Sequence, residues 1–217
     1  IILHREGDVL PSKRINCIYE DKDGSIWVGT PLGVVCFKPD GSTILLAKKD
    51  GLSFTDVWDV ARDGNNRLWF ATYGGGLFRQ DSKGKFIRFN QDHGLTNNTV
   101  HCMQTDQFGR LWIGTGSGVT RLDGDKVTNF TEREGLCSDA VMSLVTDSWG
   151  NIWFGTSGGG ACCLDGERFI HFNEKSGDMG AWVYAVHCDK KGHMWFASSR
   201  GGVTEYDGMY YTNYYEG

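Results

Sequence analysis

The side chains best suited to binding chemistry in this sequence are aromatic, acidic and nitrogen-bearing residues that occur singly within a repeated pattern. Aromatic ring faces accompanied by a few carboxylate acceptors and planar donors suit sugars and other flat or amphipathic ligands. We therefore predict a non-covalent ligand-binding site. Its candidate residues are Asp56, Trp58, Tyr73, His101, Asp139, Trp182, Tyr184 and Arg200.

A simpler interpretation applies to three of these residues. Trp58, Trp182 and Tyr184 could instead fill space between packed sheets, because large rings contribute much of the contact area in protein cores. The residue types alone do not decide between ligand binding and packing for these three side chains.

Catalysis finds no support in the residue pattern, because neither a nucleophilic triad nor a pair of acids stands out. The glycine run Gly158–Gly160 leads into a strand, whereas a phosphate site uses a following helix. His187 and His193 could face each other near Cys188, but at the opposite end from the variable loops. We therefore predict no enzymatic activity, no catalytic residue, no metal and no cofactor.

Composition narrows the classes of partner. The net charge is -5 and no basic run is present, so a nucleic-acid partner is not expected. No apolar run approaches the roughly 20 residues of a membrane span, so we expect no direct membrane insertion. The 31 Gly against 3 Pro favour many tight turns between strands.

The seven cysteines follow neither a zinc-binding nor a disulfide pattern. Their number is odd and no Cys-x-x-Cys pair occurs, so we expect buried thiols that act as small apolar residues. Such thiols persist in a reducing compartment, which leaves a cytoplasmic location open.

The elements that must position the candidate residues are set by a ten-residue motif that occurs five times. Its tryptophans are spaced by 41 to 43 residues, and an Asp lies six positions before each of them. A Gly lies three positions before, except in the second copy, where Asn66 tolerates the same left-handed backbone. We interpret the Asp as a turn cap, the Gly as the turn and the Trp as filler between sheets. The five tryptophans are Trp27, Trp69, Trp112, Trp153 and Trp195.

Each period can be divided into four short strands, of which the first two are almost continuously apolar. Such strands are covered on both faces. In the first period the predicted strands are Ile15–Glu20, Ser25–Gly29, Gly33–Phe37 and Thr43–Ala47. Antiparallel four-stranded sheets repeated in series predict an all-β fold, a β-propeller of five blades with a period of about 42 residues.

The predicted propeller is a single domain over residues 1–217. Its repeats cover about 8–50, 51–92, 93–134, 135–176 and 177–217, and residues 1–7 are an orphan outer strand. In an up-and-down sheet, the turn from strand two to three shares one end with the entry to strand one. The candidate residues all lie at that end.

The pattern D-x-x-G-x-[IL]-W-[IVF]-G-T resembles the two-component regulator propeller repeat. This resemblance implies an extracytoplasmic sensor region of a bacterial hybrid two-component system, periplasmic or extracellular, with a small-molecule ligand such as an oligosaccharide. One alternative is a propeller lyase resembling streptogramin lyase, which would need clustered His and acidic groups with a metal. Another alternative is a protein-interaction scaffold.

The number of chains in the native assembly is left open by the sequence. Ile1–His4 competes with Tyr210–Tyr214 for the outer edge of the last blade, so one strand could pair with a second molecule. We predict a closed five-bladed monomer. The alternatives are an open part of a larger propeller and a dimer that closes a larger ring.

Overall fold

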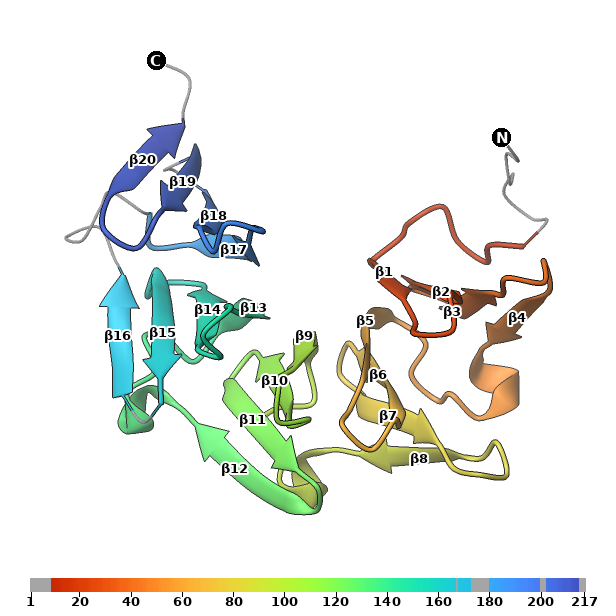
Figure 1. The fold of residues 1–217 in the computed structure, drawn as a ribbon. Coiled ribbons are helices and arrows are strands. Elements are labelled where there is room, and N and C mark those ends of the chain that lie inside the picture. The colour runs from red at the N-terminus through yellow and green to blue at the C-terminus, as the bar shows by residue number, and fades with distance from the viewer. Residues whose placement is uncertain (1–8, 167, 173–179, 200–201, 215–217) are drawn as a thin grey trace. The chain divides into compact units, whose positions relative to one another are not determined.

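The structure is a computed structural model that describes residues 9–166, 168–172, 180–199 and 202–214. In the described part of the chain, twenty strands form five four-stranded antiparallel sheets. The sheets follow one another in chain order (Figure 1). We refer to these sheets as blades one to five. The predicted all-β propeller class with five blades is confirmed. The chain divides into two compact units, residues 1–101 and 102–217, and each is described by itself.

The first unit contains blades one and two and the start of blade three. In each complete sheet, the strands lie side by side in the order in which they occur along the chain. Their bounds are β1 (Cys17–Glu20), β2 (Ile26–Thr30), β3 (Gly33–Phe37), β4 (Thr43–Leu46), β5 (Val57–Arg62), β6 (Leu68–Thr72), β7 (Gly76–Gln80) and β8 (Phe86–Phe89).

The second unit contains the rest of blade three and blades four and five. The boundary falls within the first strand of blade three, β9 (Val100–Thr105). The other strands are β10 (Leu111–Thr115), β11 (Gly118–Asp123), β12 (Lys126–Phe130), β13 (Val141–Thr146), β14 (Ile152–Thr156), β15 (Ala161–Asp165), β16 (Arg168–Phe172), β17 (Val183–Cys188), β18 (Met194–Ser198), β19 (Gly202–Tyr206) and β20 (Tyr211–Tyr214).

The loops that leave the first three blades each contain one short 3₁₀ turn. These turns are η1 (Lys48–Asp50), η2 (Gln91–His93) and η3 (Glu132–Glu134). Each ends at a glycine with a left-handed backbone, for example Gly135 at φ 105°.

The bounds of the predicted strands agree with the observed ones to within about two residues. The largest difference is at β1, which begins at Cys17 rather than Ile15.

The repeated Asp does more than cap its turn. In blade three, Asp106 accepts hydrogen bonds from the backbone N–H groups of Phe108 and Arg110, at 2.9 and 3.0 Å. Its other oxygen accepts one from the indole N–H of Trp112 at 2.8 Å. The Asp thus joins the turn to the Trp six residues later. The same Asp–Trp hydrogen bond occurs in the other four blades.

Three of the repeated tryptophans, Trp27, Trp112 and Trp153, also pack toward the following blade, as predicted. Trp112 is 1% exposed and clusters with Val141, Leu144 and Phe154 of blade four. Trp153 does the same with Phe196 of blade five, at 5.8 Å between ring centroids. The core of the second unit therefore lies between successive sheets.

The predicted backbone exception is also confirmed. Asn66 has φ 62° and is the one non-glycine residue with a positive φ in the described part of the chain. It stands where the other copies of the motif have Gly. The orphan strand predicted over residues 1–7 lies outside the described residues.

Candidate ligand-binding site

The described candidate residues lie at the end of each blade that holds the turn from its second to its third strand and the entry to its first strand. We call this the loop end. A backbone hydrogen bond joins those two segments in three blades. In blade two, the N–H of Tyr73 donates to the carbonyl of Asp56 at 3.0 Å. The equivalent bonds are Ser157 to Ala140 in blade four and Ser199 to Trp182 in blade five.

A β-bulge places one extra residue near the start of the first strand in blades two, four and five. In β5, Val57 pairs with Thr72 and Asp59 pairs with Ala71, which leaves Trp58 as the bulged residue. Met142 and Tyr184 occupy the same place in β13 and β17. A bulge redirects a side chain out of the regular alternation of a strand. The bulges therefore turn the side chains of Trp58 and Tyr184 out of the regular alternation of their strands.

In the first unit, three candidate rings form one aromatic cluster. Trp58 stacks on Tyr73 with ring centroids 5.3 Å apart and an interplanar angle of 27°. His101 lies against the same indole at 5.6 Å and 34°. Tyr73 is 54% exposed, whereas Trp58 and His101 are half-buried. Tyr73 is thus the ring that faces solvent, and Trp58 supports it.

Asp56 is held beside this cluster by an asparagine of blade one. The side-chain amide of Asn16 donates to Asp56 Oδ1 at 2.8 Å and to the carbonyl of Val57 at 2.9 Å. The indole N–H of Trp58 is buried and finds no acceptor among the described residues. Since buried polar groups normally have partners, this N–H is a donor that a ligand or a water molecule can satisfy.

In the second unit, Trp182 and Tyr184 present separate, exposed rings. They are 50% and 49% exposed. The backbone of Trp182 is fixed, because it bridges to Ser157 of blade four and its carbonyl accepts the N–H of Ser199 at 3.1 Å. The two side chains therefore stand on a rigid backbone without being buried by the neighbouring blade.

Asp139 lies at the entry to β13 in the same unit, and its bonds are structural. Its carboxylate accepts the N–H of Glu132 at 2.8 Å, and its carbonyl accepts the N–H of Gly118 at 2.6 Å. Arg200, the remaining candidate, lies outside the described residues. The structure thus groups Asp56, Trp58, Tyr73 and His101 in the first unit and leaves Asp139, Trp182 and Tyr184 as single residues of the second.

Sequence reasoning missed Asn16 as a partner of the site. Asn16 occupies the position eleven residues before a repeated Trp, as do Trp58, His101, Met142 and Tyr184. A search for residue types that vary at this one repeat position would have found it. The bulge itself has no sequence signature, because the extra residue does not change the repeat length.

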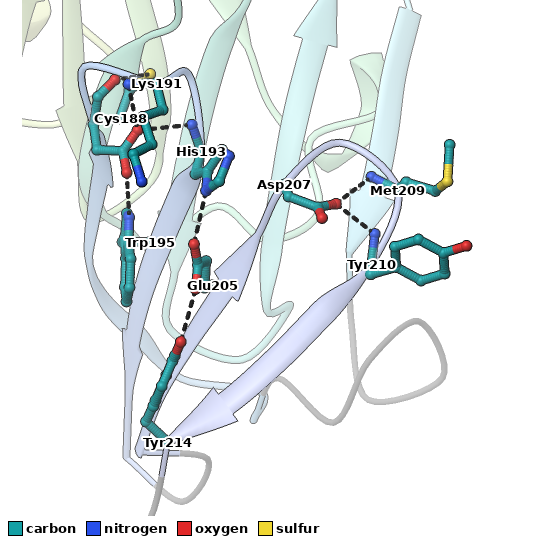
Figure 2. A network of polar contacts seen from close by, with 10 residues as sticks. Cys188, Lys191, His193, Trp195, Glu205, Asp207, Met209, Tyr210 and Tyr214 are labelled. Carbon is teal, nitrogen blue, oxygen red and sulfur yellow. Dashed lines mark hydrogen bonds and ion pairs between the residues drawn. The ribbon is translucent and has the colours of Figure 1, made fainter.

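One histidine of blade five, His193, belongs to a polar network. His193 Nδ1 hydrogen-bonds Glu205 Oε1 at 2.7 Å, and the hydroxyl of Tyr214 donates to Glu205 Oε2 at 2.8 Å (Figure 2). These hydrogen bonds, the one from His193 first, lower the pKa of the Glu205 carboxyl. His187 instead lies opposite Trp195 in the strand register. Within the described ranges, no group of three or more His, Cys, Asp or Glu side chains could hold a metal ion.

Comparison with protein families identifies the repeat. The model of the two component regulator propeller matches residues 9–31, 51–74, 94–117 and 135–158. These segments cover the loop end and the first two strands of blades one to four. No curated protein matches the chain. Among the described residues, no helix is long and apolar enough to cross a membrane.

Solved structures share the fold at low sequence identity. The chain is similar to the extracellular domain assigned to a hybrid two component system, BT3049 of B. thetaiotaomicron, with 24% identity and a TM-score of 0.79 over 95% of this chain and 29% of that one. For BT4673 of the same organism the values are 21%, 0.78, 98% and 32%. The chain therefore spans about three tenths of the length of these domains.

A catalytically inactive virginiamycin B lyase from Staphylococcus aureus is also similar, with 15% identity and a TM-score of 0.73 over 94% of this chain and 71% of that one. At these identities the structural likenesses show the fold alone, whereas the family model matches the repeat itself. Because four of its five blades carry segments that match this model, the chain contains repeats of the two-component regulator propeller family.

Proposed function

We propose that this chain is a ligand-binding propeller of an extracytoplasmic sensor region and that it has no catalytic role. Support comes from the family model, which matches two-component regulator propeller repeats, and from the fold shared with extracellular domains assigned to two component systems. The location outside the cytoplasm is part of the proposal. The blade structure would act as a rigid scaffold for a site at the loop end.

The ligand class we propose is carbohydrate-like, and the aromatic cluster of the first unit carries this proposal. Tyr73 is exposed and is held in place by its stack on Trp58 and by its backbone bond to Asp56. Sugars offer apolar C–H faces for such a ring and hydroxyl groups for a neighbouring carboxylate. Asp56 and the indole N–H of Trp58 supply an acceptor and a donor beside the ring.

Binding would require several contacts at once. One aromatic contact is worth about 0.5–1.5 kcal/mol beyond the area it buries, so a single ring contributes roughly a twofold to twelvefold gain in affinity. In the first unit these contacts are the Tyr73 ring, the Asp56 carboxylate and the indole N–H of Trp58. The exposed rings Trp182 and Tyr184 offer a separate stacking surface within the second unit.

The test is a binding screen followed by matched variants. A panel of oligosaccharides is screened by thermal shift, and each hit is titrated by calorimetry against the wild type, Tyr73→Ala and Trp149→Ala. We expect Tyr73→Ala to weaken binding at least threefold without lowering the melting temperature. Trp149 is the control, because it is 70% exposed but lies in the turn at the opposite end of blade four.

The competing interpretations predict other outcomes. If no saccharide binds but a protein partner is retained, the scaffold alternative replaces the sensor. If both variants bind a saccharide as tightly as the wild type, the site lies away from Tyr73. Cleavage of a streptogramin by the purified chain would instead support the lyase alternative.

A further inference from the structure

Two of the seven cysteines lie against each other at the junction of blades three and four. Cys137 belongs to the loop between β12 and β13, and Cys162 lies in the middle of β15. The backbone N–H of Cys137 donates to Cys162 Sγ at 3.4 Å. Both side chains pack into the same apolar cluster, around Trp112 and Phe154.

The loop that carries Cys137 is tied to blade four on both sides. The carbonyl of Gly135 accepts a hydrogen bond from His171 Nε2 at 2.7 Å. A Cβ built on Gly159 would meet the carbonyl oxygen of Cys137 at 2.1 Å, so only glycine lets the two segments approach this closely. The backbone around Cys137 is therefore held against blade four by contacts that do not involve sulfur.

This pair of cysteines is peculiar to one blade junction. The residues that correspond to Cys137 in the two preceding loops are Ser53 and Thr96. Those that correspond to Cys162 in strand register are Val35, Phe78, Thr120 and Thr204. The fold thus accepts Ser or Thr at the first position and Val, Phe or Thr at the second. The repeat does not require a thiol at either.

The two thiols differ in exposure and in pKa. Cys137 is partly exposed and Cys162 is buried. A hydrogen bond from the Cys162 thiol lowers the pKa of Cys137, whereas burial raises the pKa of Cys162. The thiolate is the attacking species in exchange, so Cys137 is the thiol that meets an oxidant and Cys162 is the thiol that resolves the product.

We propose that Cys137 and Cys162 are a redox-modifiable pair that forms a reversible disulfide with a small-molecule disulfide as the oxidant. The Cys137 thiolate attacks one sulfur of the oxidant, whose S–S bond breaks and releases one thiol. Cys162 then loses its proton and attacks the Cys137 sulfur, which displaces the second thiol. The two protein thiols are oxidised by two electrons, and the small disulfide is reduced to two thiols.

The test uses oxidised glutathione with the folded chain. After acid quenching and denaturation, remaining thiols are alkylated with N-ethylmaleimide and counted by intact mass. We expect five alkylated cysteines instead of the seven in the sequence, and a peptide map that joins Cys137 to Cys162. Seven alkylated cysteines, or a join between other cysteines, would overturn the proposal.

Two variants separate the roles of the pair, and a third is the control. Cys162→Ser should accumulate a glutathione adduct on Cys137, because the resolving thiol is gone. Cys137→Ser should leave Cys162 unmodified. Cys163→Ala, which alters the next residue of the same strand, should still form the cross-link. A stable glutathione adduct on Cys137 in the wild type would show that the two sulfurs cannot meet.

A second readout does not depend on the variants folding. The cross-link would join residues 25 positions apart and so restrict the unfolded chain. For a loop of this length, the oxidised wild type should melt roughly 5–10 °C above the reduced wild type. Addition of a reducing agent should return the original value. An unchanged melting temperature after confirmed oxidation would show that the bond strains the loop as much as it restricts the unfolded state.

Discussion

At the residue scale, the repeated Asp is the centre of each blade's local structure. Asp106 is 5% exposed and binds two backbone N–H groups, the indole of Trp112 and the guanidinium of Arg110. Burial alone would raise the pKa of this carboxyl, but the hydrogen bonds from Trp112 and Arg110 outweigh it and lower the pKa. The pKa of the equivalent Asp63 is lowered in the same way.

These lowered pKa values predict a loss of stability in acid. A carboxyl whose pKa is lower in the folded state contributes stability that is present above its unfolded pKa, about 3.9, and lost as the pH falls through the folded value. We expect the free energy of unfolding, measured in urea, to fall steeply below about pH 4. Asp106→Asn should make this fall shallower. An unchanged slope would show that Asp106 has the same pKa in both states.

Truncation of a repeated Trp tests its place between blades. Trp112→Ala should lower the free energy of unfolding by about 3–5 kcal/mol, as other large core truncations do, because the ring is almost fully buried. Trp149→Ala is the matched control and should cost under about 0.5 kcal/mol. Chemical denaturation of both variants gives the comparison. A cost under about 1 kcal/mol for Trp112→Ala would contradict the packing role.

At the scale of the element, close packing limits the size of the side chains that can face each other on the first and second strands of a blade. A Cβ added to Gly114 would lie 2.5 Å from Cys102 Sγ and 2.8 Å from Val141 Cγ1 of the next blade. Blade five has Ala185 paired with Ala197 at the same two positions. In blade five a methyl group is therefore accepted in the second strand beside a small side chain in the first strand.

This comparison predicts a compensating pair of substitutions. Gly114→Ala should destabilise the chain by about 1–3 kcal/mol through overpacking. Adding Cys102→Ala reproduces the combination found in blade five, and it should recover part of that loss because the two residues share one contact. A double-mutant cycle by urea unfolding measures the coupling. Strictly additive effects would mean that Val141 alone causes the clash.

At the scale of the whole molecule, one exposed hydrophobic position bears on association. Ile18 of β1 is 70% exposed, whereas the equivalent residues of the following blades are buried: Val60, Met103, Leu144 and Val186. Exposed apolar side chains on a sheet face are common sites of self-association. The closed five-bladed monomer and pairing through a terminal strand both stay predictions.

Light scattering decides between them. We expect a monomer of 24.2 kDa and no change in mass for Ile18→Lys. If the wild type is instead a dimer that Ile18→Lys dissociates, a second copy covers the face of β1 and the monomer prediction is wrong. Deletion of Ile1–His4 is the companion variant, and it tests pairing through the terminal strand.

Much of the fold was predictable because its determinants are local. The Asp-to-Trp motif spans seven residues. Its turn, its left-handed Gly or Asn66 and the strand that follows can therefore be predicted from neighbouring residues in the sequence. The number of repeats then implies the number of blades. Because a repeat needs a neighbour to bury its Trp, the blades must pack in series. The shared loop end of the candidate residues also follows from strand direction alone.

The sequence by itself thus determined the five blades, their strands and the end at which variable aromatic residues gather. Tertiary structure decided which of those residues meet: Trp58 with Tyr73 and His101, but Trp182 and Tyr184 as single exposed rings. It also decided that Cys137 meets Cys162. The physical reason is that these contacts depend on bulges and on loop closures between blades, where the separation along the chain says nothing about side-chain direction.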